Sequence, residues 1–440
     1  MSTDKRARLK QWLESGEARL YPLTFPQREL WEVSPVPPSD IANHICCLIE
    51  VRGAITQEDC LAAIQRVVDR QDVLRLSILP GKDQPLQMVR KKLETNFQFR
   101  ELTASQTPPE ALEELAQEVF SQPFDMVGGP LYRIELLRRT PQDHVLVFAV
   151  HHAIADGWSL GAFIQDLGVS YVQGVMGKRG PLPPLPCSYM SWGAAEREAW
   201  PADLLRARAD FWKKQLDGAM RLWPRQPVAP TPSRPQRWVS EFSPELVQAV
   251  RNLARAHGAT LFSTLLTGFQ IALAQWTGKE DIVVGTPVAN RGLKSMWETM
   301  GYCAGIIPLR GQVEKDRSFS ESLRQVHANT VDALGNVMPF VELTHALGEK
   351  AASGHNPIFQ VRFALQNHPV PDVELPGLSA RLQMRSTGTA RFEMACEITE
   401  MSEALEVVFL FRRDLFSLAD MQDLKELFAA ALKAACDSTK

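Results

Sequence analysis

The feature that most constrains this chain is an apolar run that ends in two histidines. Residues 145–150 read Val-Leu-Val-Phe-Ala-Val, and His151 and His152 follow directly. Side chains of a β-strand alternate between its two faces, and here both faces are apolar. This pattern is typical of a central strand that is covered on both sides, which favours an α/β architecture.

The residues after this strand indicate a turn into a helix. Asp156 and Gly157 follow the histidines, and apolar side chains recur at helical spacing over residues 160–171. Gly157 lets a ligand or another backbone approach closely. The amides around Gly157 and Trp158 would lie at a helix N-terminus, where they can stabilise developing negative charge. We expect Ser159 to be the N-cap of this helix rather than a nucleophile.

Strand geometry gives the two histidines different positions. Neighbouring residues point to opposite faces, so His151 and His152 cannot both face one cavity. One should be structural and hydrogen-bonded within the turn, while the other reaches a cavity. The same geometry argues against a shared metal ion, and the pattern offers no third clustered ligand. A buried Asp156 needs a cation, so we expect a salt bridge that holds the turn.

Cys303 is a second candidate nucleophile, because Gly301-Tyr302-Cys303-Ala304-Gly305 has the spacing of a nucleophile elbow. An elbow requires a strand before it and a helix after it. Here a strand-like segment, residues 306–309, comes after the motif instead. We therefore interpret the motif as a tight glycine turn that leads into a strand.

Periodicity predicts helices over residues 6–17 and 196–216 and a strand over 74–78. Residues 181–186 and 224–235 are rich in proline, and the first run is typical of a rigid crossover between lobes. Helices and strands alternate in both halves of the chain. Its 440 residues are enough for two cores, so we place one lobe at 1–180 and the other at 181–440.

Composition narrows the class of partner. A formal net charge of −3 gives no reason to expect nucleic acid or an anionic membrane surface. No apolar run reaches membrane-spanning length, and residues 1–6 lack the apolar core of a signal peptide. The seven cysteines show no Cys-x-x-Cys spacing, which indicates reduced thiols in a cytoplasmic protein.

The stretch from His151 to Ser159 resembles HHxxxDG, the signature of the condensation domains of nonribosomal peptide synthetases. That family resembles chloramphenicol acetyltransferase in fold. Other family motifs have similar segments here in the same order: 23–31 (LTFPQRELW), 70–75 (RQDVLR), 123–125 (PFD), 129–133 (GPLYR), 285–291 (GTPVANR), 300–302 (MGY), 356–361 (NPIFQV) and 414–416 (DLF). The resemblance covers nearly the whole chain, and the ordered set is far more specific than any single motif.

Two departures from the family pattern concern the donor-side pocket rather than the fold. Residues 303–305 read Cys-Ala-Gly where the family often has Phe, Val and Asn. Gln71 and Asp72 replace the His and Glu of the family's RHExLR segment. All four residues of HHxxxDG are present, which argues against a catalytically dead relative.

The resemblance implies two acetyltransferase-like α/β lobes in a V around a central tunnel. Substrates bound to carrier proteins would enter from opposite faces on phosphopantetheine arms, and no metal or redox cofactor is implied. His152 would face the tunnel near the reacting atoms, with backbone donors near Gly157 at the oxyanion.

The resemblance also implies the residues that support this site. His151 and Asp156 would be structural, and Arg291 would be the partner of Asp156. Trp158 and Arg70 would lie on the tunnel or its acceptor side.

The resulting hypothesis is acyl transfer, in which an amine or hydroxyl attacks a thioester and forms an amide or ester. His152 would accept the proton of the nucleophile or orient it. We expect a free-standing enzyme that receives its carriers in trans or a domain excised from a larger synthetase. Two alternatives remain, namely a catalytically silent module that recruits partners and a hydrolase that admits water to the tunnel.

Overall fold

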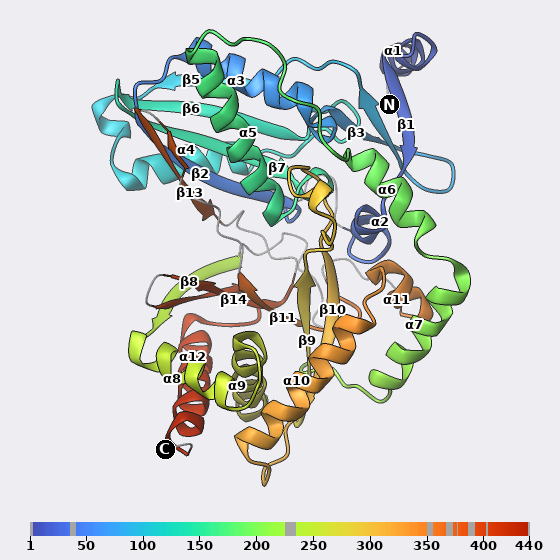
Figure 1. The fold of residues 1–440 in the computed structure, drawn as a ribbon, viewed down its shortest axis with the longest axis vertical. Coiled ribbons are helices and arrows are strands. Elements are labelled where there is room, and N and C mark those ends of the chain that lie inside the picture. Colours follow the sequence, from blue (N-terminus) through green and yellow to red (C-terminus); the bar gives the residue numbers. More distant parts are fainter. Residues whose placement is uncertain are drawn as a thin grey trace.

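The computed structural model describes residues 3–35, 41–224, 235–349, 355–366, 373–375, 377–385, 392–401 and 404–438. Its helices and strands form two lobes that meet along one side and diverge on the other (Figure 1). This is the V expected for two acetyltransferase-like lobes, and the predicted α/β fold class is confirmed.

The first lobe is built on a six-stranded sheet in the order β12-β13-β2-β7-β6-β5, and helices α3 and α5 lie across one face of it (Figure 1). A small sheet, β1-β4-β3, lies beside it. The elements are α1 (Thr3–Glu14), β1 (Ala18–Pro22), α2 (Phe25–Glu32), β2 (His44–Gly53), α3 (Gln57–Arg70), β3 (Leu76–Leu79), β4 (Leu86–Arg90), β5 (Phe97–Glu101), α4 (Pro109–Phe120), β6 (Tyr132–Thr140), β7 (Asp143–His151) and α5 (Gly157–Val175).

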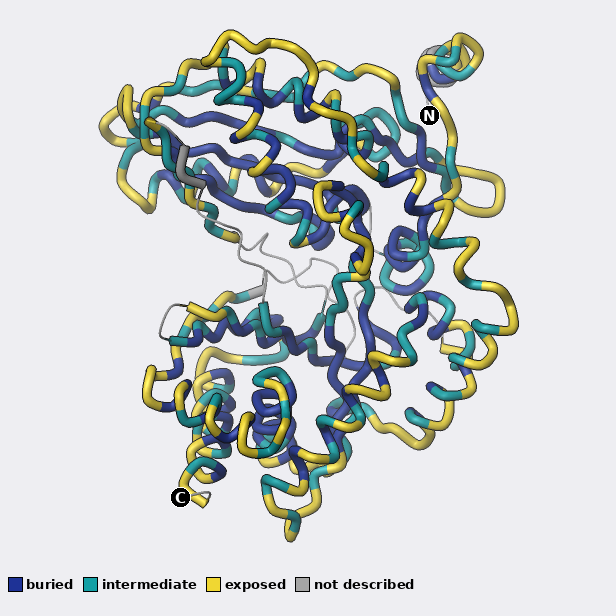
Figure 2. Tube along the Cα trace, in the orientation of Figure 1, coloured by how far each residue is buried: buried dark blue, intermediate teal, exposed yellow. Residues whose placement is uncertain are grey.

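The apolar run identified in the sequence is β7, and it lies inside this sheet. It pairs in antiparallel fashion with β2 on one side and β6 on the other. Every residue of β7 after Asp143 is buried. The predicted central strand is therefore confirmed, and it carries the two histidines to the edge of the first core (Figure 2).

The second lobe has a six-stranded sheet in the order β10-β9-β11-β14-β15-β8, with α8, α9, α10 and α12 on one face (Figure 1). Helices α6 and α7 run along the side where the lobes meet. The elements are α6 (Tyr189–Glu198), α7 (Ala202–Gln215), β8 (Pro235–Phe242), α8 (Pro244–Ala256), α9 (Leu261–Thr277), β9 (Asp281–Val288), β10 (Gly305–Gln312), α10 (Phe319–Gly335), α11 (Phe340–Ala346), β11 (Val361–Gln366), β12 (Val373–Leu375), β13 (Leu378–Arg385), β14 (Met394–Glu400), β15 (Leu405–Arg412) and α12 (Leu418–Asp437).

Two segments from the second half of the chain belong structurally to the first lobe. Strand β13 pairs with β2 along its length, and β12 extends the sheet beyond β13. The buried side chains of Met296, Met300, Tyr302 and Cys303 are part of the first hydrophobic core. The division at residues 180 and 181 stays a prediction, and these two segments cross it.

Three predicted elements differ from the structure. The first helix is Thr3–Glu14 rather than 6–17. The single helix expected over 196–216 is two, α6 and α7, because Pro201 lacks the N–H that a continuous helix needs and lies at the break. The strand expected at 74–78 begins only at Leu76, after a 3-10 turn over Asp72–Arg75. Most of the proline-rich stretch at 224–235 lies outside the described residues.

Gly285, in the middle of β9, shows how closely the second core is packed. A Cβ atom built there would lie 2.1 Å from the ring of Phe359, which is itself buried. Gly161 in α5 provides a matched control, because a Cβ there would meet no atom within 4 Å.

We predict that Gly285→Ala lowers the melting temperature, because overpacking a core costs about 1–3 kcal/mol. Gly161→Ala should leave it unchanged or raise it, since alanine is favoured over glycine inside a helix. Thermal unfolding followed by circular dichroism measures both. Equal melting temperatures in the two variants would contradict the packing described here.

Candidate active site between the lobes

His151 ends β7 and is held within the turn that follows. Its backbone N–H donates to the carbonyl of Leu131 at 2.9 Å. Its Nδ1 accepts the N–H of Ala153 at 3.0 Å, and the side chain is buried. His151 thus has the position expected of the structural histidine.

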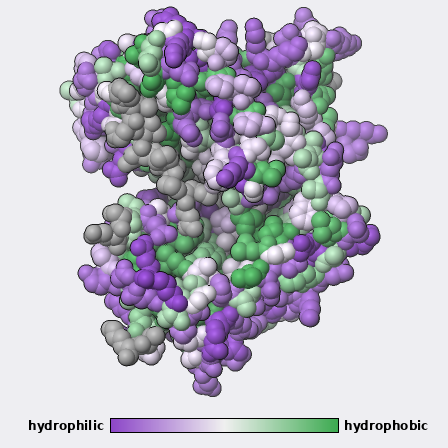
Figure 3. Space-filling view, viewed as in Figure 1, coloured by the Kyte–Doolittle hydropathy of each residue, from purple (hydrophilic) through white to green (hydrophobic). Residues whose placement is uncertain are grey.

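His152 begins a 3-10 turn and lies on the wall of a cavity between the lobes. Its N–H donates to the carbonyl of Asn43 at 2.6 Å, which fixes the backbone at this point. Its ring lies 4.2 Å, centroid to centroid, from the ring of Tyr302. The cavity has a volume of about 320 Å³ and is lined from both lobes. The surface is hollowed between the lobes in the space-filling view (Figure 3).

Asp156, not Ser159, is the N-cap of α5. The Asp156 carboxylate accepts the N–H of Ser159 at 3.0 Å and its hydroxyl at 2.8 Å. The Ser159 hydroxyl accepts the N–H of Asp156 at 3.1 Å in return. The prediction that Ser159 caps the helix was therefore wrong. The aspartate comes first in the chain, and the serine three residues later completes a capping box.

The expected ion pair between Asp156 and Arg291 is present. Nη2 of Arg291 lies 3.1 and 3.2 Å from the two carboxylate oxygens, and the side chains are only 1% and 3% exposed. The Oδ2 atom of Asp156 also accepts the N–H groups of Cys303 and Ala304, each at 3.1 Å. One carboxylate of the first lobe therefore holds both a cation and a backbone segment from the second half of the chain.

Arg291 gathers the same segment from the other side. Its Nη1 donates to the carbonyls of Met296 at 2.9 Å and Thr299 at 2.6 Å. Its Nη2 donates to the carbonyl of Gly301 at 3.0 Å, and that carbonyl also accepts the hydroxyl of Ser159. The segment that carries Tyr302 to His152 is fixed by these contacts.

Electrostatics keep Asp156 ionised. Burial alone would raise the pKa of the carboxyl group, but Arg291 and the hydrogen bonds from Ser159 and Cys303 hold the pKa below its usual value. A carboxylate with four fixed donors and a depressed pKa is poorly suited to carry a proton in turnover. The interpretation of Asp156 as a buttress is consistent with this geometry.

Gly157 is the first residue of α5 and lines the cavity beside Trp158. A Cβ at Gly157 would meet no atom within 4 Å, so the helix N-terminus is open to a ligand. Nε1 of Trp158 donates to the carbonyl of Trp297 at 2.9 Å, which fixes the indole at the cavity wall. The structure thus brings together His152, Gly157 and Trp158 as predicted.

Arg70 was expected on the tunnel, but it is not among the described residues that line the cavity. Its guanidinium forms ion pairs with Asp166 and, at 2.5 Å, with Glu298. Gln71 donates to Asp166 at 2.8 Å and accepts the N–H of Met300 at 3.0 Å. Arg70 and Gln71 fasten the 296–303 segment to the first lobe, which is a structural position.

Cys303 does not have the surroundings of a nucleophile. Its side chain is fully buried, and burial raises the pKa of its thiol well above the usual value. A reactive cysteine needs a lowered pKa and access to substrate. Since β10 begins at Gly305, the glycine-rich segment is a turn into a strand, as the sequence indicated.

Sequence reasoning missed His44, which also lines the cavity. His44 lies opposite His151 in the β2–β7 pairing. Its Nδ1 is 3.1 Å from the carbonyl of Phe120, an acceptor, so Nδ1 carries the proton. Burial, together with the charge of Arg133, lowers the pKa of His44 to about 4. Only knowledge of which strand pairs with β7 would have revealed it.

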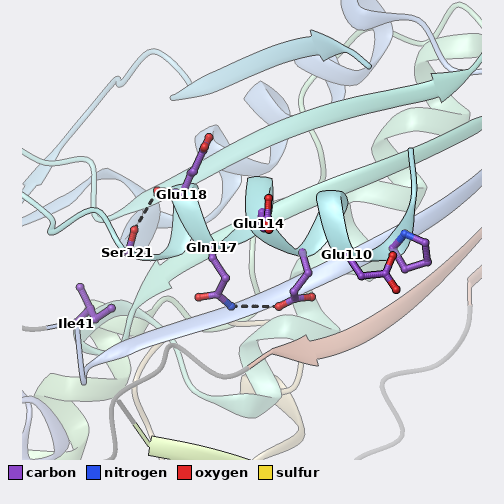
Figure 4. Close-up of a pocket in the computed structure, with 8 residues that line it drawn as sticks. Ile41, Glu110, Glu114, Gln117, Glu118 and Ser121 are labelled. Carbon is purple, nitrogen blue, oxygen red and sulfur yellow. Dashed lines mark hydrogen bonds between the residues drawn. The ribbon is translucent and has the colours of Figure 1, made fainter. Parts of the chain in front are cut away.

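A second depression, of about 800 Å³, lies on α4 and is separate from the site (Figure 4). Four glutamates of α4 line it: Glu110, Glu113, Glu114 and Glu118. None of the HHxxxDG residues borders it. No helix among the described residues is long and apolar enough to cross a membrane.

The model of the family described as Condensation domain matches residues 17–440. This chain belongs to the condensation domain family. The resemblance drawn from the ordered motifs is thereby confirmed, and it accounts for the position of HHxxxDG at the lobe interface.

Relatives of this condensation domain are parts of large synthetases. The chain is 28% identical over 422 residues to a linear gramicidin synthase of Brevibacillus parabrevis, covering 92% of this chain and 8% of that protein. It is 29% identical to phosphinothricin tripeptide synthetase PhsC of Streptomyces viridochromogenes, covering 93% of this chain and 38% of that protein. It therefore spans a minor part of the length of these relatives.

Solved structures share the fold of this condensation domain. The X-domain in a complex with OxyB from teicoplanin biosynthesis has a TM-score of 0.83 at 20% identity, over 94% of this chain and 93% of that one. The SgcC5 protein of Streptomyces globisporus has a TM-score of 0.79 at 24% identity, over 95% and 99%.

The lowered pKa of His44 predicts a pH-dependent stability. The unfolded chain takes up a proton at His44 near pH 6.5, whereas the folded protein does so only near pH 4. The free energy of unfolding should therefore fall as the pH drops from 6.5 toward 4. His44→Leu should make this fall smaller, measured as urea midpoints at pH 7 and pH 5. An unchanged pH dependence in the variant would contradict the assignment of a neutral, buried His44.

Proposed function

We propose that this condensation domain transfers an acyl or peptidyl group from a carrier-protein thioester to an amine or hydroxyl, forming an amide or ester. One observation carries the proposal. His152 faces a cavity between the lobes beside the N-terminus of α5, while Asp156 is fully engaged by Arg291. The site thus presents one histidine to the cavity for proton transfer and an open helix end for negative charge.

The reaction follows from these positions. The amine or hydroxyl attacks the thioester carbonyl, and His152 accepts its proton or orients it for attack. The carbonyl oxygen gains negative charge, which backbone N–H groups at Gly157 stabilise. Collapse of this intermediate breaks the C–S bond and releases the carrier thiol. General base catalysis contributes about 10²–10⁴-fold and positioning can exceed it, so both roles of His152 predict a large loss on its removal.

The proposed partners are acyl or peptidyl carrier proteins that act in trans and deliver substrates on phosphopantetheine arms. The names of the synthetase relatives support such a setting, as does a cavity lined from both lobes. The free cysteines, five of seven buried, suit a reducing compartment, and we place the protein in the cytoplasm.

Turnover with an acyl-carrier thioester, with and without an amine or alcohol acceptor, tests this function. We predict acceptor-dependent product that falls at least about 100-fold in His152→Ala. His257→Ala is a matched control, because His257 lies at the end of α8 and does not line the cavity.

Two outcomes would overturn the proposal. Release of free acid regardless of acceptor would indicate a thioester hydrolase. Binding of the acyl carrier without turnover would indicate a silent recruitment module. Mass spectrometry of the products distinguishes these results, and it also shows whether an amide or an ester forms.

A further inference from the structure

The proposed mechanism leaves one charged pair in the cavity without a role. Arg362 on β11 and Glu397 on β14 form an ion pair, and both residues line the cavity on the wall of the second lobe. Their side chains are 20% and 23% exposed, so both can be reached from the cavity. The described wall around them is otherwise mainly apolar, with Leu365, Phe392 and Leu410.

Strand geometry directs this pair away from the helices that cover the sheet. In the parallel β11–β14 register, Arg362 is opposite Ala395, two residues before Glu397 on the same face. The intervening Cys396 and the neighbouring Phe363 are buried in the second hydrophobic core. The ion pair therefore belongs to the cavity wall and not to the packing of the lobe.

The chemistry of the pair determines what can cover it. A guanidinium has five N–H donors in a fixed fork. The described residues supply Arg362 with one hydrogen-bond partner, Glu397, which leaves donors for a ligand. A hydrocarbon chain placed against the pair would remove water from two charges and return no hydrogen bond, which is unfavourable. An amide matches both groups, because its carbonyl accepts from Arg362 and its N–H donates to Glu397.

We propose that Arg362 and Glu397 form a polar subsite that selects an acyl substrate carrying an uncharged donor–acceptor group, such as an amide, over a plain hydrocarbon chain. The inference rests on the proposed acyl transfer, since it assigns the cavity to an acyl chain. It makes Arg362 and Glu397 specificity-determining residues on the lobe opposite His152.

The test uses non-reactive acyl analogues on aminopantetheine, in which an amide replaces the thioester. A chain ending in a carboxamide is compared with one ending in an isopropyl group of the same shape, over spacers of two to four methylenes. Because both carry the same pantetheine, any difference in affinity comes from the acyl end. Isothermal titration calorimetry on the full chain gives the Kd values.

We expect wild-type protein to bind the carboxamide chain at least about tenfold more tightly than its isopropyl match at one or more spacer lengths, as hydrogen bonds to charged groups permit. The double variant Arg362→Met/Glu397→Leu removes both charges together, so neither is left unpaired, and it should prefer the isopropyl chain. The control is Arg237→Met/Glu406→Leu, an ion pair at 4.0 Å on β8 and β15 of the same sheet, outside the residues that line the cavity. It should keep the wild-type preference.

Three results would overturn the subsite. They are no preference in the wild type at any spacer, the same preference in both double variants, and an equal loss of both analogues in Arg362→Met/Glu397→Leu. The last would assign the pair to the amides of the pantetheine arm. If acceptor-dependent turnover by His152 persists, only the subsite fails. Absence of both binding and turnover would overturn the proposed function as well.

Discussion

The ion pair between Asp156 and Arg291 is the interaction on which the rest of the site depends. It joins the N-terminus of α5 to the segment after β9, and both side chains are almost completely buried. Removing one partner of such a pair leaves an unpaired charge in the interior, which is why single substitutions of buried pairs cost about 3–5 kcal/mol. The geometry of the cavity at His152 is therefore tied to the contact between the lobes.

This arrangement separates the roles of the residues of the HHxxxDG stretch by position. His151 is bonded within the turn, Asp156 is held by Arg291 and two backbone N–H groups, and His152 lies on the cavity wall. Glycine at 157 leaves the end of α5 open beside it. A fixed first-lobe turn and a second-lobe segment tied to it can position a nucleophile against a carbonyl without any large side chain between them.

Local pattern explains which parts could be predicted from the sequence. The run at 145–150 and the periodicity after Gly157 depend on nearby residues, so β7, α5 and the split between His151 and His152 were accessible. Arg291 was named only through the family resemblance, because nothing local connects it to Asp156. The capping of α5 was misassigned because Asp156 and Ser159 can each cap a helix, and only the three-dimensional structure shows which one does.

Long-range pairing explains what was missed. The addition of β13 to β2, the place of His44 opposite His151 and the Arg362–Glu397 pair all depend on which strands become neighbours. Arg70 was assigned to the tunnel from its motif, yet its partners, Asp166 and Glu298, lie about 100 and more than 200 residues further along the chain. Spacing along the chain gives no information about such contacts.

A double-mutant cycle on Asp156 and Arg291 tests the central claim most directly. The free energy of unfolding is measured for Asp156→Asn, Arg291→Gln and the double variant. If the pair holds the lobes together at the site, the double variant should cost less than the sum of the single variants by about 1–3 kcal/mol. Strictly additive losses would show that the two side chains act independently, and would contradict the account.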